Sequence, residues 1–151
     1  MSASNMTKPE TLELVRADYR HFLSIPTRWM DNDVYGHVNN VEYYSYFDTV
    51  VNHYMMARGG LDYLNGTCVG FVVETQCSYK RPIAFPDVVE AGIRVARIGT
   101  SSVTYEVGLF IEGQDAIRAF GHFVHVYVDK ASGKPVPIPK QARVAMDAIR
   151  V

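Results

Sequence analysis

The spacing of apolar residues along the chain changes from a helical period to a strand period. Between Asn40 and Arg58, apolar side chains recur every three or four residues, at Val41, Tyr44, Phe47, Val50, Val51, Tyr54 and Met55. This spacing predicts one helix of about nineteen residues, roughly 28 Å long. Asn39 is suited to be its N-cap, Glu42 lies where a capping box places an acid, and Gly59-Gly60 is suited to end the helix.

Strand patterns lie on both sides of this helix. The run from Tyr19 to Trp29 is rich in β-forming residues, and Pro26 within it indicates an edge position. After the helix, residues alternate between apolar and polar, which predicts four strands: Val69–Tyr79, Asp87–Ile98, Val103–Ile111 and Ala116–Val128. In the first of them the alternation places these residues on one face: Phe71, Val73, Thr75, Cys77 and Tyr79. The segment 132–139 is Pro-rich, and a short helix is expected over 140–149.

The order of the expected elements is one strand, one helix and then four strands. Helix and strands do not alternate, which argues for the α+β class, with an antiparallel sheet that packs one face on the helix. The length of 151 residues and the hydrophobic content of 48% fit one compact domain over residues 1–151.

Composition excludes several kinds of partner. A net charge of −1 with mixed signs provides neither a basic surface for nucleic acid nor a polybasic patch for a membrane. The N-terminal segment has no apolar signal-peptide core, and no run reaches the roughly 18 apolar residues of a membrane span. We therefore expect a cytoplasmic protein with a small-molecule partner. Cys68 and Cys77 form no CxxC motif, and His37 has no companions at metal-ligand spacing, so no metal site is expected.

The loop that leads into the helix carries the candidate chemistry. It reads RWMDNDVYGHVNN from Arg28 to Asn40 and places an acid close to the unpaired N–H groups of a helix N-terminus. A carboxylate on one side of a carbonyl and a donor for its oxygen on the other can catalyse acyl transfer. Asp33 is the candidate acid, although Asp-Val-Tyr-Gly is also a good turn sequence. Asp31 is interpreted as an acceptor that stabilises the loop.

These residues resemble a known family. The segment RWMDNDVYGHVNNVEYYSYFD is similar to the "D-x-D-x-x-G-H-V-N-N" signature of hotdog-fold acyl-CoA thioesterases of the 4-hydroxybenzoyl-CoA thioesterase type. The later YKRPIAFPDVVE run and the PVPIP tail also resemble that family, with Pro86 where the family usually has Gly. The resemblance implies a sheet wrapped around one central helix, no metal and no redox cofactor. Because a sheet wrapped around one helix leaves edges and a face that neighbours can close, a homodimer is the expected minimum, and the resemblance implies a tetramer built from dimers.

The resemblance also assigns roles to residues. Asp33 maps to the catalytic acid, and Asn40 or a neighbour maps to the helix amide that meets the thioester carbonyl. One acid can suffice because a thioester leaves as a thiolate with a pKa of about 8.5. Asp33 could act as a general base or as a nucleophile, and the sequence leaves both open. The residues assigned to binding acyl-CoA are Tyr35, Gly36, His37 and Asn39 in the loop and the cations Lys80, Arg81 and Arg97.

Two alternatives to hydrolysis remain open from the sequence. A hotdog hydratase or dehydratase of acyl thioesters would use an Asp/His pair, for which Asp33 and His37 are candidates. The chain could also be a non-catalytic module that binds acyl-CoA.

Overall fold

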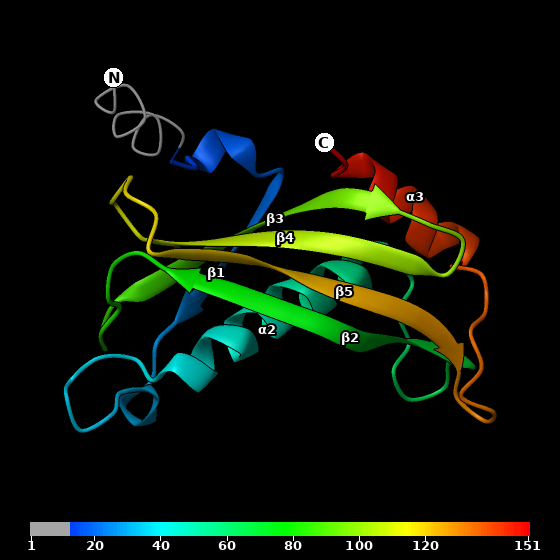
Figure 1. The fold of residues 1–151 in the computed structure, drawn as a ribbon, viewed down its shortest axis with the longest axis horizontal. Helices are drawn as coiled ribbons and strands as arrows, with labels where there is room; N and C mark the ends of the chain where they lie inside the picture. Colours follow the sequence, from blue (N-terminus) through cyan, green and yellow to red (C-terminus); the bar gives the residue numbers. More distant parts are fainter. Residues whose placement is uncertain (1–12) are drawn as a thin grey trace, which may run out of the picture.

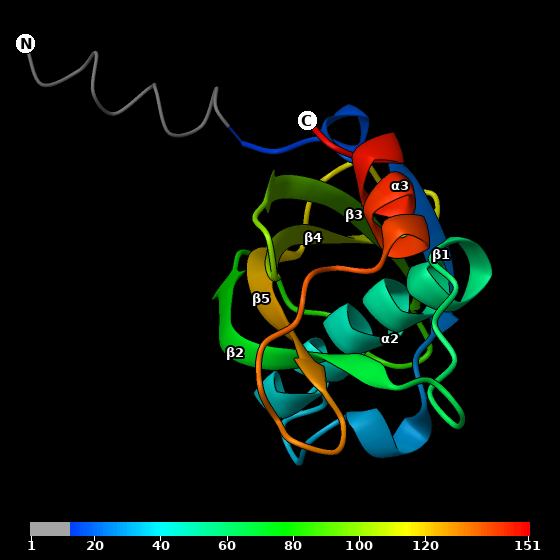
Figure 2. The same cartoon turned by 90° about the vertical axis from the view of Figure 1, so that its right-hand side faces the viewer.

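A five-stranded antiparallel sheet curves around one long helix in this protein. The computed structural model describes residues 13–151, so most of the N-terminal segment on which the signal-peptide expectation rests lies outside the described residues. Figures 1 and 2 show the helix inside the curve of the sheet. The elements are β1 (His21–Pro26), α2 (Asn40–Arg58), β2 (Cys68–Tyr79), β3 (Val88–Ile98), β4 (Ser102–Ile111), β5 (Ala119–Asp129) and α3 (Lys140–Ala148), with 3₁₀ turns at Arg16–Asp18 and Trp29–Asp31. The α+β class and the hotdog arrangement are confirmed.

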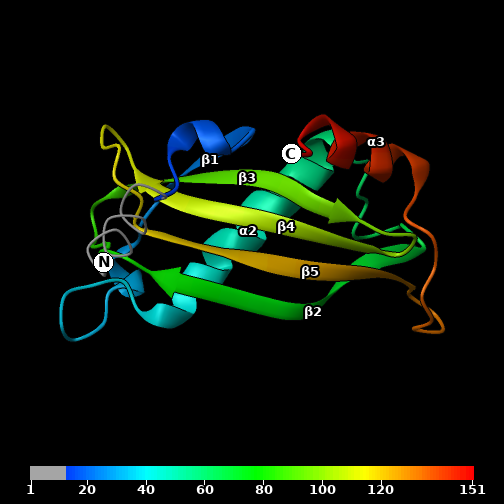
Figure 3. The same cartoon turned by 45° about the horizontal axis from the view of Figure 1, so that its top comes forward.

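The strands lie in the order β1-β3-β4-β5-β2, and every pairing is antiparallel. Figure 3 shows β3, β4, β5 and β2 side by side over the helix. Strands β1 and β2 are the edges, so each has one hydrogen-bonded neighbour. The edge position predicted from Pro26 is confirmed, because β1 pairs with β3 alone. Pro26 is the last residue of β1 and lies opposite Val88.

Helix α2 begins and ends at the residues that the sequence predicts. The Asn39 side chain caps it by accepting a hydrogen bond from the Val41 N–H (3.2 Å), and Gly60 follows it with a φ of 72°. The capping-box expectation for Glu42 is wrong. The Asn39 N–H donates to the Asp31 carbonyl instead (2.9 Å), and the Glu42 carboxylate lies 3.6 Å from Arg28.

The main core fills the space between α2 and the concave face of the sheet. The buried side of α2 contributes Phe47, Val50, Val51 and Tyr54, and β3 contributes alternate residues from Val89 to Val95. Helix α3 closes one end of this core, where the Tyr54 hydroxyl donates to the Ala145 carbonyl (2.7 Å). No helix within residues 13–151 has the length and apolar character needed to cross a membrane.

Strand β2 departs from the expected alternation. Its register against β5 shifts between Val72 and Glu74, so a bulge at Val73 interrupts the period of two. Phe71 pairs with Val126 and therefore shares a face with it, whereas Thr75, Cys77 and Tyr79 face the helix. The prediction that Phe71 shares the face of Cys77 and Tyr79 is therefore wrong.

The ends of the first and last strands also differ from the prediction. Strand β1 is shorter than Tyr19–Trp29, because the chain turns at Trp29 into the 3₁₀ turn that ends at Asp31. Strand β5 starts at Ala119 rather than Ala116, because the connection from β4 is longer than the predicted Glu112–Asp115 turn.

Candidate active site

The segment between β1 and α2 folds back on itself in a small hairpin-like turn. Asn32 and Val38 form an isolated antiparallel bridge, and between them the Asp33 N–H donates to the His37 carbonyl (2.8 Å). The Gly36 N–H returns a hydrogen bond to the Asp33 carbonyl (3.1 Å), at a φ of 84° that favours glycine. Asp33 therefore lies at the base of a tight turn rather than in a flexible stretch.

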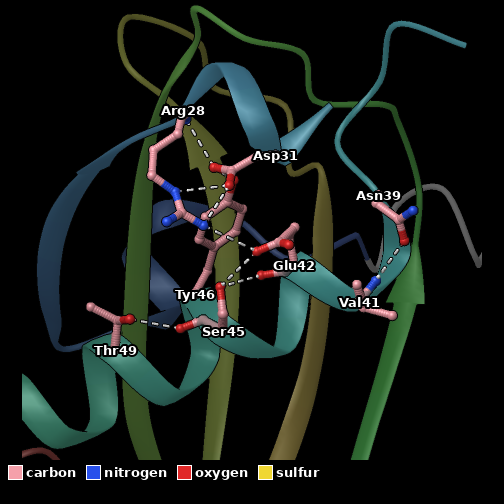
Figure 4. Close-up of polar contacts among 8 residues, drawn as sticks. All are labelled: Arg28, Asp31, Asn39, Val41, Glu42, Ser45, Tyr46 and Thr49. Carbon is pink, nitrogen blue, oxygen red and sulfur yellow. Dashed lines mark hydrogen bonds and ion pairs between the residues drawn. The ribbon is translucent and has the colours of Figure 1, made fainter. Parts of the chain in front are cut away.

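Asp31 anchors this segment to helix α2, as Figure 4 shows. Its side chain is 1% exposed, and its carboxylate accepts hydrogen bonds from the Arg28 N–H (2.9 Å), the Arg28 Nε (3.0 Å) and the Tyr46 hydroxyl (2.9 Å). Burial by itself would raise the pKa of Asp31, but the donors from Arg28 and Tyr46 outweigh it and hold that pKa below its usual value. The structure is consistent with the loop-stabilising role expected of Asp31.

Residues 83–85, which follow β2, also fix the loop between β1 and α2 through two hydrogen bonds. The Val38 N–H donates to the Ile83 carbonyl (2.7 Å), and the Phe85 N–H donates to the Asn32 side chain (3.0 Å). The turn that carries Asp33 is thus fixed between the start of α2 and residues 83–85.

Asp33 is half-buried and keeps one carboxylate oxygen free within the described residues. Its Oδ1 accepts a hydrogen bond from the Tyr35 N–H (2.8 Å), as in an Asx turn, and residues 13–151 offer no donor to Oδ2. Asp33 also has no ion pair there. Its carboxylate can therefore serve a turn and still present an oxygen to a substrate or a water.

An open cleft of about 450 Å³ lies beside Asp33. The loop and the start of α2 form one wall and the end of β2 forms the other, with these residues in the lining: Asp33, Tyr35, His37, Val38, Asn40, Tyr43, Tyr79, Lys80, Arg81 and Pro82. The cleft brings together most of the site residues predicted from the sequence. Gly36 and Asn39 are not in this lining; Gly36 shapes the turn and Asn39 caps the helix.

The residue that carries the first amide of α2 also lines this cleft. The Asn40 N–H donates to no acceptor within residues 13–151, as is usual for the first turn of a helix. Asn40 lines the same cleft as Asp33. The structure thus places a carboxylate and an unpaired helix amide around one volume.

Two tyrosines form the apolar wall of the cleft: Tyr43 of α2, for which the sequence left open a core position or a place in an acyl pocket, and Tyr79, which the sequence did not single out as a site residue. Tyr43 and Tyr79 pack edge to face with ring centroids 4.8 Å apart. Burial raises the pKa of Tyr79 to about 12 and also raises that of Tyr43, so both phenols stay protonated. The sequence signal for Tyr79 was its position as the last residue of a strand, directly before Lys80.

The three predicted cations differ in their placement. Lys80 is exposed at the cleft. Arg81 lines the cleft too, but its guanidinium donates to the Ile117 carbonyl and to Glu13 (3.0 Å). Arg97 lies near the end of β3 remote from Val88, roughly 30 Å along the strand at ~3.3 Å per residue. The structure does not bring Arg97 to the cleft of its own chain.

No group of three His, Cys, Asp or Glu side chains within residues 13–151 could hold a metal ion. The polar groups that the cleft presents to a substrate are hydrogen-bond donors, the Asp33 carboxylate and the cations Lys80 and Arg81.

Comparison with known proteins identifies the family to which this chain belongs. A family model described as "Thioesterase-like superfamily" matches residues 27–146, which contain the loop, the helix, β2–β5 and most of α3. The chain belongs to the thioesterase-like superfamily. Membership in this superfamily identifies it as a thioester hydrolase, in agreement with the resemblance seen in the loop sequence.

Several known proteins are similar to this chain in sequence or in fold. The PA5185 protein from Pseudomonas aeruginosa strain PAO1 is 54% identical, with a TM-score of 0.89 over 90% of this chain and 95% of that one. The PA2801 protein from Pseudomonas aeruginosa, provisionally named a thioesterase, is 29% identical, with a TM-score of 0.78 over 88% of this chain and 99% of that one. The uncharacterized protein YsmA of Bacillus subtilis (strain 168) is 28% identical over 80% of this chain and 81% of its own length.

Proposed function

We propose that this thioester hydrolase acts on acyl-CoA, with Asp33 as the catalytic carboxylate and the Asn40 N–H as the donor to the thioester carbonyl. The observation that carries the proposal is one cleft lined both by Asp33, whose carboxylate keeps a free oxygen, and by Asn40, whose N–H has no acceptor within the described residues. The resemblance of the loop sequence to acyl-CoA thioesterases supports CoA as the thiol.

The chemistry follows from these two groups. With the carbonyl oxygen at the Asn40 N–H, the charge that develops on it is stabilised by that donor and by the positive end of the helix dipole; one such donor contributes about 2.7–4 kcal/mol in well-studied enzymes. Asp33 then either removes a proton from an attacking water or attacks the carbonyl carbon itself. The second route gives a mixed anhydride, which water hydrolyses. In both routes the thiolate of CoA leaves without needing a strong acid.

The remaining predicted site residues have supporting roles in this proposal. Tyr35 and His37 line the cleft and would contact the pantetheine arm. Gly36 and Asn39 shape the turn and the helix start, while Lys80 is the cation best placed for a CoA phosphate. Arg81 supports the wall of the cleft, since its guanidinium already has acceptors. Arg97 has no role in the site of its own chain.

We also expect the protein to form homodimers through β2, as the basic unit of a dimer or tetramer. Strand β2 is an edge with an exposed run that includes Phe71 and Val73. Such an edge exposes unpaired backbone groups that a second copy can pair with. An active monomer in light scattering would contradict this part of the proposal.

The function is tested by incubating the protein with a panel of acyl-CoA and enoyl-CoA substrates. Release of CoA thiol with an equal amount of carboxylic acid is the expected result. Loss of the enoyl absorbance without thiol would instead support the hydratase alternative, for which an Asp33–His37 side-chain hydrogen bond is lacking within the described residues. Tight binding with neither change would support a non-catalytic acyl-CoA-binding module.

A further inference from the structure

Asp33 also borders a second hollow, which shares no other lining residue with the cleft that contains Asn40. This open groove has a volume of about 610 Å³ and is lined by Trp29, Met30, Asn32, Asp33, Val34 and Gly36. Asp33 is the residue that lines both hollows. The two spaces therefore diverge from one carboxylate, as the acyl chain and the CoA arm of a thioester diverge from its carbonyl carbon.

The two hollows differ in the charges that line them. The cleft with Asn40 includes Lys80 and Arg81 and so suits the phosphates of CoA. The lining of the second groove contains no cation and is dominated by three apolar side chains. A substrate with a charged arm and an apolar arm is therefore oriented in one way only.

The apolar side chains of the groove are unusually exposed. The exposed fraction is 78% for Trp29, 72% for Met30 and 94% for Val34, whereas an apolar side chain gains about 1.5–3 kcal/mol from full burial. The segment that presents them is rigid, because Asp31 and the bridge between Asn32 and Val38 fix its backbone. Trp29 is further supported by an edge contact with Phe85, at a centroid distance of 5.8 Å. A clustered, exposed and rigidly held apolar surface of this kind is typical of a binding site.

From this asymmetry we infer that the groove of Trp29, Met30 and Val34 binds the acyl chain, and that the enzyme selects thioesters with an apolar acyl group longer than acetyl. The inference rests on the proposed function and adds the class of acyl group and the side chains that select it. Adaptable Met30 and planar Trp29 can contact either an aliphatic chain or an aromatic ring.

The test compares acetyl-, octanoyl- and benzoyl-CoA on the wild-type protein and on the variants Met30→Ser and Val34→Ser. Because both side chains are exposed, neither change should impair folding. Each should lower kcat/KM for octanoyl-CoA by about four- to tenfold, which is the effect of losing the burial of about one methylene group or slightly more. The value of kcat/KM for acetyl-CoA should stay unchanged, because its acyl group is too short to reach these side chains. The response to benzoyl-CoA shows whether aryl groups use the same groove.

The matched control is Val144→Ser, which removes an exposed valine from α3. It should leave the ratio of octanoyl to acetyl turnover as in the wild type. A second comparison is Tyr79→Phe, which changes the wall of the other cleft and should not alter that ratio.

Three results would overturn the inference. One is an unchanged ratio in both groove variants, and another is a ratio that changes in Tyr79→Phe alone, which would place the acyl chain in the cleft with Asn40. The third is dissociation of the groove variants into smaller species in light scattering, which would assign the patch to a subunit contact. Wild-type hydrolysis of any of the three thioesters keeps the proposed function intact under these outcomes, whereas failure to hydrolyse acyl-CoA at all would overturn the proposed function itself.

Discussion

Asp31 and Asp33 are two residues apart in one loop, yet their surroundings are opposite. Asp31 is buried, and donors from Arg28 and Tyr46 occupy its carboxylate. Asp33 is half-buried, and within the described residues its carboxylate accepts only the Tyr35 N–H. The same type of side chain thus fixes the loop backbone at Asp31 and lines a cleft at Asp33.

The difference shows how a loop can be both rigid and reactive. A reactive carboxylate needs a free oxygen, so it can contribute little to holding its own segment. Asp31 supplies that anchoring through its carboxylate, and its carbonyl accepts the Asn39 N–H at the start of α2. The position of Asp33 relative to Asn40 is therefore set by the contacts of Asp31 together with the hydrogen bonds of the turn, which leave the Oδ2 of Asp33 free within the described residues.

The largest expected effect follows from Asp33→Asn. This change keeps the shape and the acceptor for the Tyr35 N–H but removes basicity and nucleophilicity. We expect kcat for acyl-CoA hydrolysis to fall by about 10³-fold, within the range for a lost acid–base group, with the free energy of unfolding changed by no more than about 0.5 kcal/mol. Asp115→Asn, at a fully exposed carboxylate, is the matched control and should leave kcat unchanged.

Asp31→Asn is expected to act mainly on stability. It removes the charge of a buried carboxylate that accepts hydrogen bonds from Arg28 and Tyr46; since one hydrogen bond to a charged group contributes about 1.5–3 kcal/mol, we expect the unfolding free energy to fall by about 3 kcal/mol. Tyr46→Phe deletes one donor to the same carboxylate and should cost about 1.5–3 kcal/mol. Urea unfolding of the three proteins provides the measurement. Equal midpoints would show that the network in Figure 4 does not stabilise the fold.

A pH effect of similar or smaller size is expected from His125, which lies beneath α2 rather than in the loop. Burial lowers the pKa of His125 to about 4, with Asp48 as a weaker opposing influence. In the unfolded chain the pKa is about 6.5, so unfolding takes up a proton between these values, and stability is lost as the pH falls from about 6.5 to about 4. The loss should reach about 3 kcal/mol at pH 4.

The contribution of His125 is isolated by comparison with His125→Gln. Urea unfolding at pH 7 and at pH 4 should show a smaller acid loss in this variant than in the wild type. An identical acid loss in both proteins would mean that His125 is protonated as readily in the folded chain as in the unfolded one.

The smallest expected effect concerns the cations. Lys80→Ala should raise KM for acyl-CoA by about threefold and leave kcat unchanged, because an exposed charge contributes roughly 0.2–1 kcal/mol of uniform binding. Arg97→Ala should leave KM unchanged, since Arg97 lies away from the cleft of its own chain. With a pantetheine thioester, which lacks the nucleotide phosphates, the effect of Lys80→Ala should disappear.

The sequence predicted those features that depend on residues near one another in the chain. Helix α2 has the predicted ends because its apolar period, its Asn39 cap and the Gly59-Gly60 stop are all local. The loop motif likewise located Asp33 and Asn40, which the structure places at one cleft. The ends of the helix followed from local spacing, and the two site residues followed from one contiguous motif and its resemblance to a known family.

Features that depend on distant partners were not predictable. The bulge at Val73 arises in the pairing of β2 with β5, and Arg81 is engaged by Glu13 and by the Ile117 carbonyl. The sequence pattern indicates no polar partner for Tyr46, and only folding brings its hydroxyl to Asp31. Such contacts join residues that no local spacing connects.

The most direct test of the account measures kcat and the free energy of unfolding for Asp33→Asn and Asp31→Asn in parallel, with assays well below both melting temperatures. The account predicts a crossed result. Asp33→Asn should lose turnover by about 10³-fold and keep its stability, while Asp31→Asn should lose about 3 kcal/mol of stability and retain more turnover than Asp33→Asn. Near-wild-type turnover in Asp33→Asn, or a greater loss of turnover in Asp31→Asn, would contradict the assignment of Asp33 as the catalytic carboxylate.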